Sequence, residues 1–266
     1  GRGHPPAAVT ASAVSSLLRL SIPPVPGDEL RLQQQGVIAE PTYGSQLQDM
    51  AIPGHAPEGR IRLDWSYQQI ALADGSLVEL RQPQPQLDAL GYGPLHPQTQ
   101  FSLRIAPPMI GLGLLEAISE ADLLANEDPL DRNQDGISGR ANRVWDIRQQ
   151  QNSLGRFGWK AGQPNLNQQN ASAFAGDMGL TTTLIQTDDC SSAQQACRQQ
   201  PNGGAPEVSA EILASVLFYS RNLAVPKRRN VSDPQVLKGK ALFHQAGCAA
   251  CHVPAFTTAA DAPEKE

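Results

Sequence analysis

Residues 244–256, HQAGCAACHVPAF, place two cysteines and a histidine within five positions. Cys248 and Cys251 are three residues apart, so a helical turn puts both sulfurs on one face, and the ring of His252 is free to point across that face. This is the spacing by which haem c is attached, with two thioether bonds to the porphyrin edge and an imidazole on the iron. The stretch therefore predicts covalent haem c at Cys248 and Cys251, with His252 as an iron ligand.

Two other uses of these thiols stay open at the level of sequence. A redox dithiol of the thioredoxin type needs a helix N-terminus to stabilise its thiolate, whereas this motif follows a helix. A zinc site could recruit His244 with Cys248 and Cys251, but His252, next to Cys251, is poorly placed to complete a tetrahedron. A haem-free dithiol or zinc module is thus the alternative to haem.

The sixth coordination position of the iron decides between electron transfer and catalysis on peroxide. The candidate side chains for it are Met50, Met109, Met178, His55 and His96. The more common role of each, however, is that of a core methionine or a surface histidine. The basic run Lys227, Arg228 and Arg229 precedes the haem motif and is either a partner for the haem propionates or a solvated charge run.

Helices are expected on both sides of this basic run. Asp233 followed by Pro234 is typical of a helix start, and a helix should run from there to about Ala246. Apolar spacing predicts further helices over 209–223 and about 111–124, and a short one in NASAFAGDMG that ends at Gly179.

The remaining segments predict loops and one β-hairpin. Prolines interrupt the first sixty residues, and a polar, glycine-rich stretch leads to about Pro164. Between Arg60 and Arg81, apolar and polar residues alternate on both sides of the turn ADGS, which is typical of a hairpin. The expected fold is mainly α, with long ordered loops and a small β-hairpin.

Composition limits the classes of partner. The 266 residues carry 21 Lys and Arg against 26 Asp and Glu, a net charge of −5, without the basic stripe that nucleic acid requires. No window approaches eighteen consecutive apolar residues, so we expect no transmembrane segment in this sequence. Nucleic-acid binding is therefore disfavoured.

The other two cysteines, Cys190 and Cys197, lie in the polar stretch DDCSSAQQAC with no histidine nearby. A disulfide between them would close a short loop and would persist only in an oxidising compartment. That agrees with haem c attachment outside the cytoplasm and predicts a periplasmic or otherwise exported protein. A pair of free thiols is the alternative.

The segment DRNQDGISGRAN is similar to the first half of a calcium loop. It places Asp131, Asn133 and Asp135 at alternate positions before Gly136, but its twelfth residue is Asn142 rather than a bidentate Glu. Calcium held by Asp131, Asn133 and Asp135 and an ion-free connection rich in Asx turns are both consistent with this pattern.

With these residues in view, the chain resembles the di-haem thiol oxidoreductases, relatives by motif of the bacterial di-haem cytochrome c peroxidases. The stretches that carry the resemblance are GRGHPP, YGSQLQDMAIPG, EGRI, APPMIGLGLLEAI, DRNQDGISGRAN, LGRFGWKAGQPNLNQQNASAFAGDMGLTT, the two loop cysteines, LAVPKRR and GKALFHQAGCAACHVPAF. Together they cover nearly the whole sequence.

The resemblance implies an internal fragment of a longer protein. In that family a first haem motif lies just upstream of the segment matching GRGHPP, and a long C-terminal part follows the second motif, which Cys248, Cys251 and His252 match. It also implies two cytochrome c-like domains: residues 1–225 as the remainder of the first, with hairpin and loop elaborations, and 226–266 as the truncated start of the second. Trp159 would lie either between the haems or in the core.

The function expected from the motif and the resemblance together is electron transfer by a haem-binding protein, part of a di-haem c-type oxidoreductase. The reaction would be that of a peroxidase or a thiol oxidoreductase, with a redox partner protein or a small oxidant. A rival reading is a non-catalytic electron carrier in which both haems have six ligands.

Overall fold

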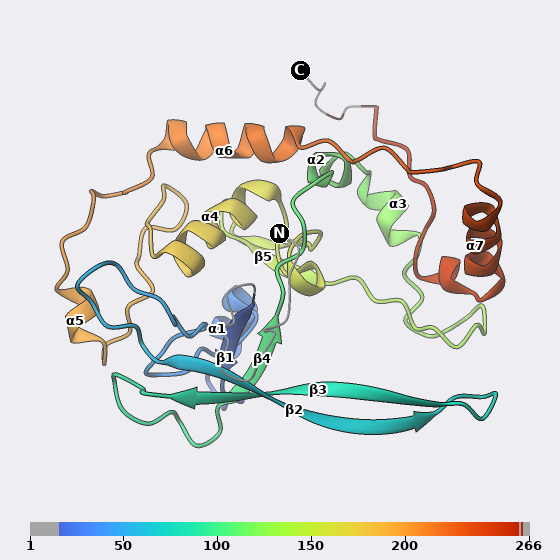
Figure 1. The fold of residues 1–266 in the computed structure, drawn as a ribbon. Coiled ribbons are helices and arrows are strands. Elements are labelled where there is room, and N and C mark those ends of the chain that lie inside the picture. The colour runs from blue at the N-terminus through green and yellow to red at the C-terminus, as the bar shows by residue number, and fades with distance from the viewer. Residues whose placement is uncertain (1–15, 261, 263–266) are drawn as a thin grey trace. The chain divides into compact units, whose positions relative to one another are not determined.

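The computed structural model describes residues 16–260 and residue 262, and within them it combines helices with small antiparallel sheets (Figure 1). In chain order the elements are β1 (Leu17–Ser21), α1 (Glu29–Gln35), β2 (Arg60–Ala71), β3 (Leu77–Asp88), β4 (Gln100–Arg104), α2 (Leu112–Glu116), α3 (Glu120–Leu124), β5 (Arg143–Asp146), β6 (Gln151–Leu154), α4 (Leu166–Met178), α5 (Gln195–Arg198), α6 (Ala210–Asn222) and α7 (Pro234–Gln245). Single 3₁₀ turns lie at Trp159–Ala161 and Cys248–Ala250.

The prediction of a mainly α fold is wrong. Helix accounts for 26% of the structure and strand for 22%, and the described residues form three two-stranded antiparallel sheets. One sheet, β1 with β4, joins Leu17 to Arg104 and Ser21 to Gln100. Because these partners are far apart in the sequence, local periodicity could not reveal their pairing.

The hairpin prediction is confirmed, and the hairpin is longer than expected. Strands β2 and β3 pair from Arg60 opposite Asp88 to Ala71 opposite Leu77. The Asp74 carboxylate accepts hydrogen bonds from the backbone N–H and the hydroxyl of Ser76, and Gly75 takes a positive φ of 83°. These contacts fix the turn of the long ribbon in Figure 1.

The chain divides into two compact units, each built from two stretches of sequence. The first comprises residues up to Pro108 together with Ala171–Ala210, and the second comprises Met109–Asn170 and the chain from Glu211 onward. The core of the first unit is formed by Leu18, Leu20, Tyr43, Leu47, Ile61 and Leu63. The predicted haem-domain division between residues 225 and 226 stays a prediction.

Most of the predicted helices are present. The segment expected to be one helix over 111–124 is instead two helices, α2 and α3, because Ser119 begins a new one: its hydroxyl accepts a hydrogen bond from the backbone N–H of Asp122. Helix α7 begins as expected, with the Asp233 carboxylate accepting from the N–H of Gln235 and Pro234 in the first turn. No described helix is long and apolar enough to cross a bilayer.

Candidate functional site

The cysteine-histidine motif forms a tight turn directly after α7. Gly247, with φ of 75°, reverses the chain at the end of the helix, and Cys248 then opens a 3₁₀ turn. The carbonyl oxygen of Cys248 accepts hydrogen bonds from the N–H groups of Cys251 at 3.3 Å and His252 at 2.9 Å. The local fold therefore brings all three residues of the motif onto one turn.

Both thiols of the motif are free and exposed. The ring of His252 is exposed and lies against Phe243 of α7, with ring centroids 6.1 Å apart. Phe243 also contacts His244 edge-on at 5.9 Å, so one phenyl ring packs against both histidines. The motif thus presents two sulfurs and an imidazole to its surroundings, on the 3₁₀ turn that follows α7.

A cleft of about 770 Å³ in the second unit reaches this turn through Ala250 and Cys251. Its volume is within the range of small-molecule and cofactor pockets. Its apolar wall includes Leu115, Leu123, Leu124, Ile137 and Leu154, and its cationic side chains are Arg132, Arg140, Arg156 and Lys160. The acidic residues Glu127, Asp128 and Asp135 also line the cleft, and of the motif only Cys251 does, because Cys248 and His252 are not among its lining residues. Apolar surface for a porphyrin and cations for its carboxylates are present beside Cys251, and these features are compatible with haem.

One of these cations holds the wall of the cleft together. The Arg156 guanidinium donates to the carbonyl oxygens of Leu115 at 3.3 Å, Glu116 at 3.3 Å and Ile118 at 2.6 Å. These carbonyls lie at the end of α2 and just beyond it, where a helix leaves its carbonyl groups without intrahelical partners. Arg156 thereby fixes the end of α2 against the segment that follows β6.

Glutamate 116 ties the same helix to two others. Its carboxylate accepts from the Arg221 guanidinium of α6 at 2.5 Å and from the backbone N–H of Leu166, at the start of α4, at 3.1 Å. The second unit therefore holds the cleft wall by charge-assisted hydrogen bonds as well as by apolar packing.

The calcium-like loop uses its oxygens on its own backbone. Asp131 accepts from the N–H of Gly136, Asn133 from that of Asp135, and Asp135 from that of Ile137 at 2.8 Å. Among the described residues, no group of three or more histidines, cysteines, aspartates or glutamates is placed to hold a metal ion. Calcium at Asp131, Asn133 and Asp135 stays a prediction, and the contacts are those of an Asx-turn connection.

The twelfth residue of that loop, Asn142, forms hydrogen bonds outside the loop. Its side-chain N–H₂ group donates to the carbonyl oxygens of both Lys160 and Ala161 at 3.1 Å. It therefore binds the segment around the 3₁₀ turn at Trp159–Ala161 to the loop, on the wall of the cleft.

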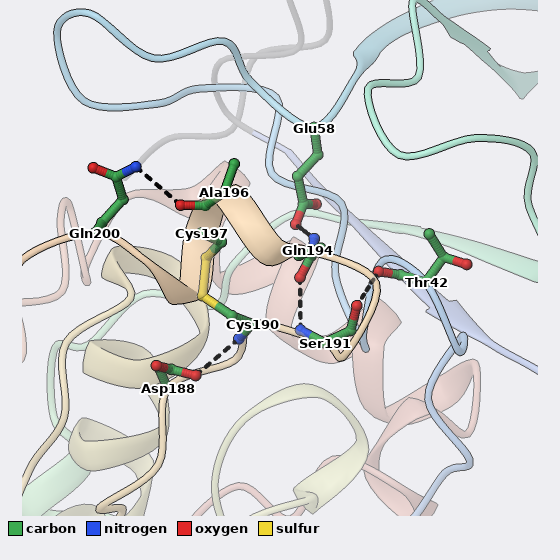
Figure 2. The surroundings of a disulfide bond; sticks show 9 residues. All are labelled: Thr42, Glu58, Asp188, Cys190, Ser191, Gln194, Ala196, Cys197 and Gln200. Carbon is green, nitrogen blue, oxygen red and sulfur yellow. Dashed lines mark hydrogen bonds between the residues drawn. A yellow bond between two sulfur atoms is a disulfide. The ribbon is translucent and has the colours of Figure 1, made fainter.

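Cys190 and Cys197 are joined by a disulfide, as Figure 2 shows. Inside the closed loop, the Ser191 hydroxyl donates to the carbonyl oxygen of Thr42 at 2.5 Å. The buried Gln194 accepts from the Ser191 N–H at 2.7 Å and donates to the Glu58 carboxylate. Within the first unit, the disulfide loop is therefore anchored to two residues far away in the sequence, Thr42 and Glu58.

None of the five candidates for the sixth iron ligand lines the cleft. Met50 and Met178 are 72% and 61% exposed and belong to the first unit, as do His55 and His96. The Nδ1 atom of His96 accepts from the N–H of Gln98. Methionine 109 belongs to the second unit but lies outside the lining of the cleft.

The basic run at 227–229 is exposed, as expected of a solvated charge run, whereas Trp159 is not in the core. Lys227, Arg228 and Arg229 are exposed and do not line the cleft. Trp159 is 45% exposed, so core packing does not account for it, and a place between haems stays a prediction. The segment GRGHPP lies outside the described residues.

Sequence reasoning missed the cationic side chains of the cleft, Lys160 above all. The only local signal was the pattern of glycines around it, Gly155, Gly158 and Gly162, in a stretch otherwise expected to be loop. Its place beside the motif cannot be derived from local pattern, because Lys160 and Cys251 line the same cleft only in the tertiary structure.

A helix-terminal Cys-x-x-Cys-His turn beside a partly apolar, cation-lined cleft is the arrangement expected of a haem protein. The sequence model of the family described as "Di-haem oxidoreductase, putative peroxidase" matches residues 20–264, and the chain belongs to this family. The family implies a haem cofactor. No curated protein and no solved structure matches the chain.

Proposed function

We propose that this chain is part of a di-haem c-type oxidoreductase and carries haem c covalently on Cys248 and Cys251. The observation that carries the proposal is that both thiols of the motif are free and that Cys251 lines a cleft of haem-compatible size and chemistry. The placement of the motif after the carboxyl end of α7 argues against the dithiol alternative, because that end of a helix disfavours an anionic thiolate.

Each residue of the motif has a separate role in this proposal. Cys248 and Cys251 supply the sulfurs of two thioether bonds, and His252 supplies an imidazole nitrogen to the iron. The leucines of the cleft exclude water from the porphyrin face. Haem, when bound, supplies one-electron oxidation and reduction of its iron.

The reaction we propose is electron transfer through two haems to a small oxidant, as in a peroxidase, or from a thiol reductant, with a redox partner protein at the other end. The family description supports the peroxidase reading. The Cys190–Cys197 disulfide supports an exported protein, because such a bond persists in an oxidising compartment.

The attachment is tested on mature protein produced in a host that has a haem c maturation system. Mass spectrometry of the peptide containing residues 248–252 should find it heavier by one haem, and the double variant Cys248→Ser with Cys251→Ser should lose that haem. An unmodified wild-type peptide from such a host would contradict the proposal.

Enzyme and carrier are separated by adding cyanide or peroxide to the same protein. A change in the absorption spectrum is expected, because a peroxidase needs an iron position open to small molecules. Unchanged spectra with both ligands would instead favour the non-catalytic electron carrier.

A further inference from the structure

The four cationic side chains of the cleft differ in their hydrogen-bond and ion-pair partners. Arg156 donates to three backbone carbonyls, and Arg140 donates to the carbonyl oxygen of Pro129 at 3.2 Å. Arg132 lies near Asp128: the pKa of that carboxyl is lowered first by the hydrogen bond from the Arg132 N–H and also by the Arg132 charge. Among the described residues, no hydrogen bond or ion pair engages the ammonium group of Lys160.

The backbone at Lys160 is held in an unusual conformation. Lys160 and Ala161 have positive φ values of 55° and 51°, which non-glycine residues seldom adopt, and such strain persists only where surrounding contacts impose it. Asn142 imposes it by donating to both carbonyls. Gly155 closes the other side, because a Cβ atom there would lie 2.0 Å from the carbonyl oxygen of Ala161.

The two hydrogen bonds from Asn142 therefore fix the backbone of an exposed lysine, whose ammonium group has no counter-ion among the described residues, on the wall of the cleft that Cys251 also lines. Haem carries two propionate carboxylates, and a lysine ammonium can form a charge-assisted hydrogen bond with a carboxylate. The basic run at 227–229, the candidate from sequence, lines no part of this cleft.

We infer that the Lys160 ammonium pairs with a propionate of the haem held by Cys248 and Cys251, and that Asn142 is the positioning residue for Lys160. This inference rests on the proposed function. It assigns a cofactor contact to Lys160 and a positioning role to Asn142, neither of which the attachment motif alone specifies.

The experiment measures the midpoint potential of that haem by spectroelectrochemical titration, after mass spectrometry has confirmed covalent haem on residues 248–252 of each protein. Lys160→Gln should shift the potential to more negative values, because a nearby positive charge favours the reduced iron. Lys160→Arg should stay near wild type, because it keeps both the charge and the donors. Lys227→Gln, the same charge change at an exposed site outside the cleft, is the matched control and should not shift it.

The role of Asn142 is tested by a double-mutant cycle. Asn142→Ala should shift the potential in the same direction as Lys160→Gln, and the double variant should shift it no further than Lys160→Gln alone, because both act through one ammonium group. Additive shifts would show that Asn142 does not act through Lys160.

The inference is overturned if Lys160→Gln leaves the potential of haem-loaded protein unchanged, or if Lys160→Arg or Lys227→Gln shifts it as far. Those results would leave the proposed function intact. A wild-type protein without covalent haem on the motif would remove the proposed function and this inference together.

Discussion

At the scale of single residues, Gly113 holds two helices of the second unit at close range. A Cβ atom on this residue of α2 would lie 2.1 Å from the carbonyl oxygen of Arg221 in α6. That oxygen belongs to backbone and cannot turn away as a flexible side chain could. The absence of a side chain at Gly113 is therefore what allows α2 and α6 to meet here.

We predict that Gly113→Ala lowers the free energy of unfolding by about 1–3 kcal/mol, as overpacking does in a well-packed interior. Chemical denaturation measures it. Gly239→Ala in α7 is the control: a Cβ atom there meets nothing within 4 Å, and alanine should stabilise the helix by about 0.5–1 kcal/mol. Equal effects of the two substitutions would show that the close contact is not what matters.

Glu58, in the first unit, is a partly buried carboxyl next to the disulfide loop. Burial raises its pKa to about 6, although hydrogen bonds from the Gln48 N–H and from Gln194 lower it, and the charges of Asp189 and Glu40 add to the rise. In the folded protein Glu58 therefore binds its proton more tightly than in the unfolded chain, whose pKa is about 4.5.

This raised pKa predicts the sign of a pH effect. Between pH 4.5 and 6 the folded state binds more protons at Glu58, so its stabilising contribution is present at low pH and is lost as pH rises through 6. The contribution of Glu58 to the free energy of unfolding changes by at most about 2 kcal/mol. Solvent screening reduces this change, because the side chain is partly exposed. Urea unfolding from pH 4.5 to 7 should show this slope in wild type and not in Glu58→Gln.

The control is Glu29→Gln, at a fully solvated carboxyl. Hydrogen bonds from its own N–H and from that of Gly27 lower the pKa of Glu29, so its contribution is present above the unfolded pKa and is lost only as pH falls further. The difference in the free energy of unfolding between Glu29→Gln and wild type should not change between pH 5 and 7. If Glu58→Gln keeps the full slope of wild type, Glu58 is not its source.

At the scale of elements, the disulfide loop is a closed ring of eight residues with two hydrogen-bonded anchors (Figure 2). Breaking the bond in Cys190→Ser with Cys197→Ser should cost about 2.5 kcal/mol on the loop-entropy relation. Comparing unfolding of wild type with and without a reductant should give a loss of the same size. The double serine variant should be unaffected by the reductant, and a wild type equally unaffected would contradict a stabilising disulfide.

At the scale of the whole molecule, the four cysteines form two pairs that differ in chemical state. Cys190 and Cys197 are bonded to each other, whereas Cys248 and Cys251 are free. In a host without haem c maturation, we predict that a thiol reagent applied to denatured, unreduced protein labels 248 and 251 alone. With maturation it should label none of the four, and peptide mapping distinguishes these results. Labelling at 248 and 251 in matured protein would show that the motif carries no haem.

Local sequence patterns predicted the elements whose causes are local. The Asp233–Pro234 start of α7, the Asp74–Gly75 turn and the α6 helix each depend on contacts within a few residues, and all three appear in the structure. The same reasoning assigned one helix to 111–124, where the cap at Ser119 makes two. It also gave too much helix overall, since strand pairs such as β1 with β4 leave no periodic signal of their own.

By itself, the sequence determined that two sulfurs and an imidazole lie on one turn, because Cys248, Cys251 and His252 fall within five positions. It also indicated the disulfide through two cysteines in one short polar loop. Only the tertiary structure decided which surfaces meet that turn. The cleft, and Lys160 within it, arise from segments far apart along the chain, and their meeting is set by packing and by contacts such as those of Asn142 and Arg156.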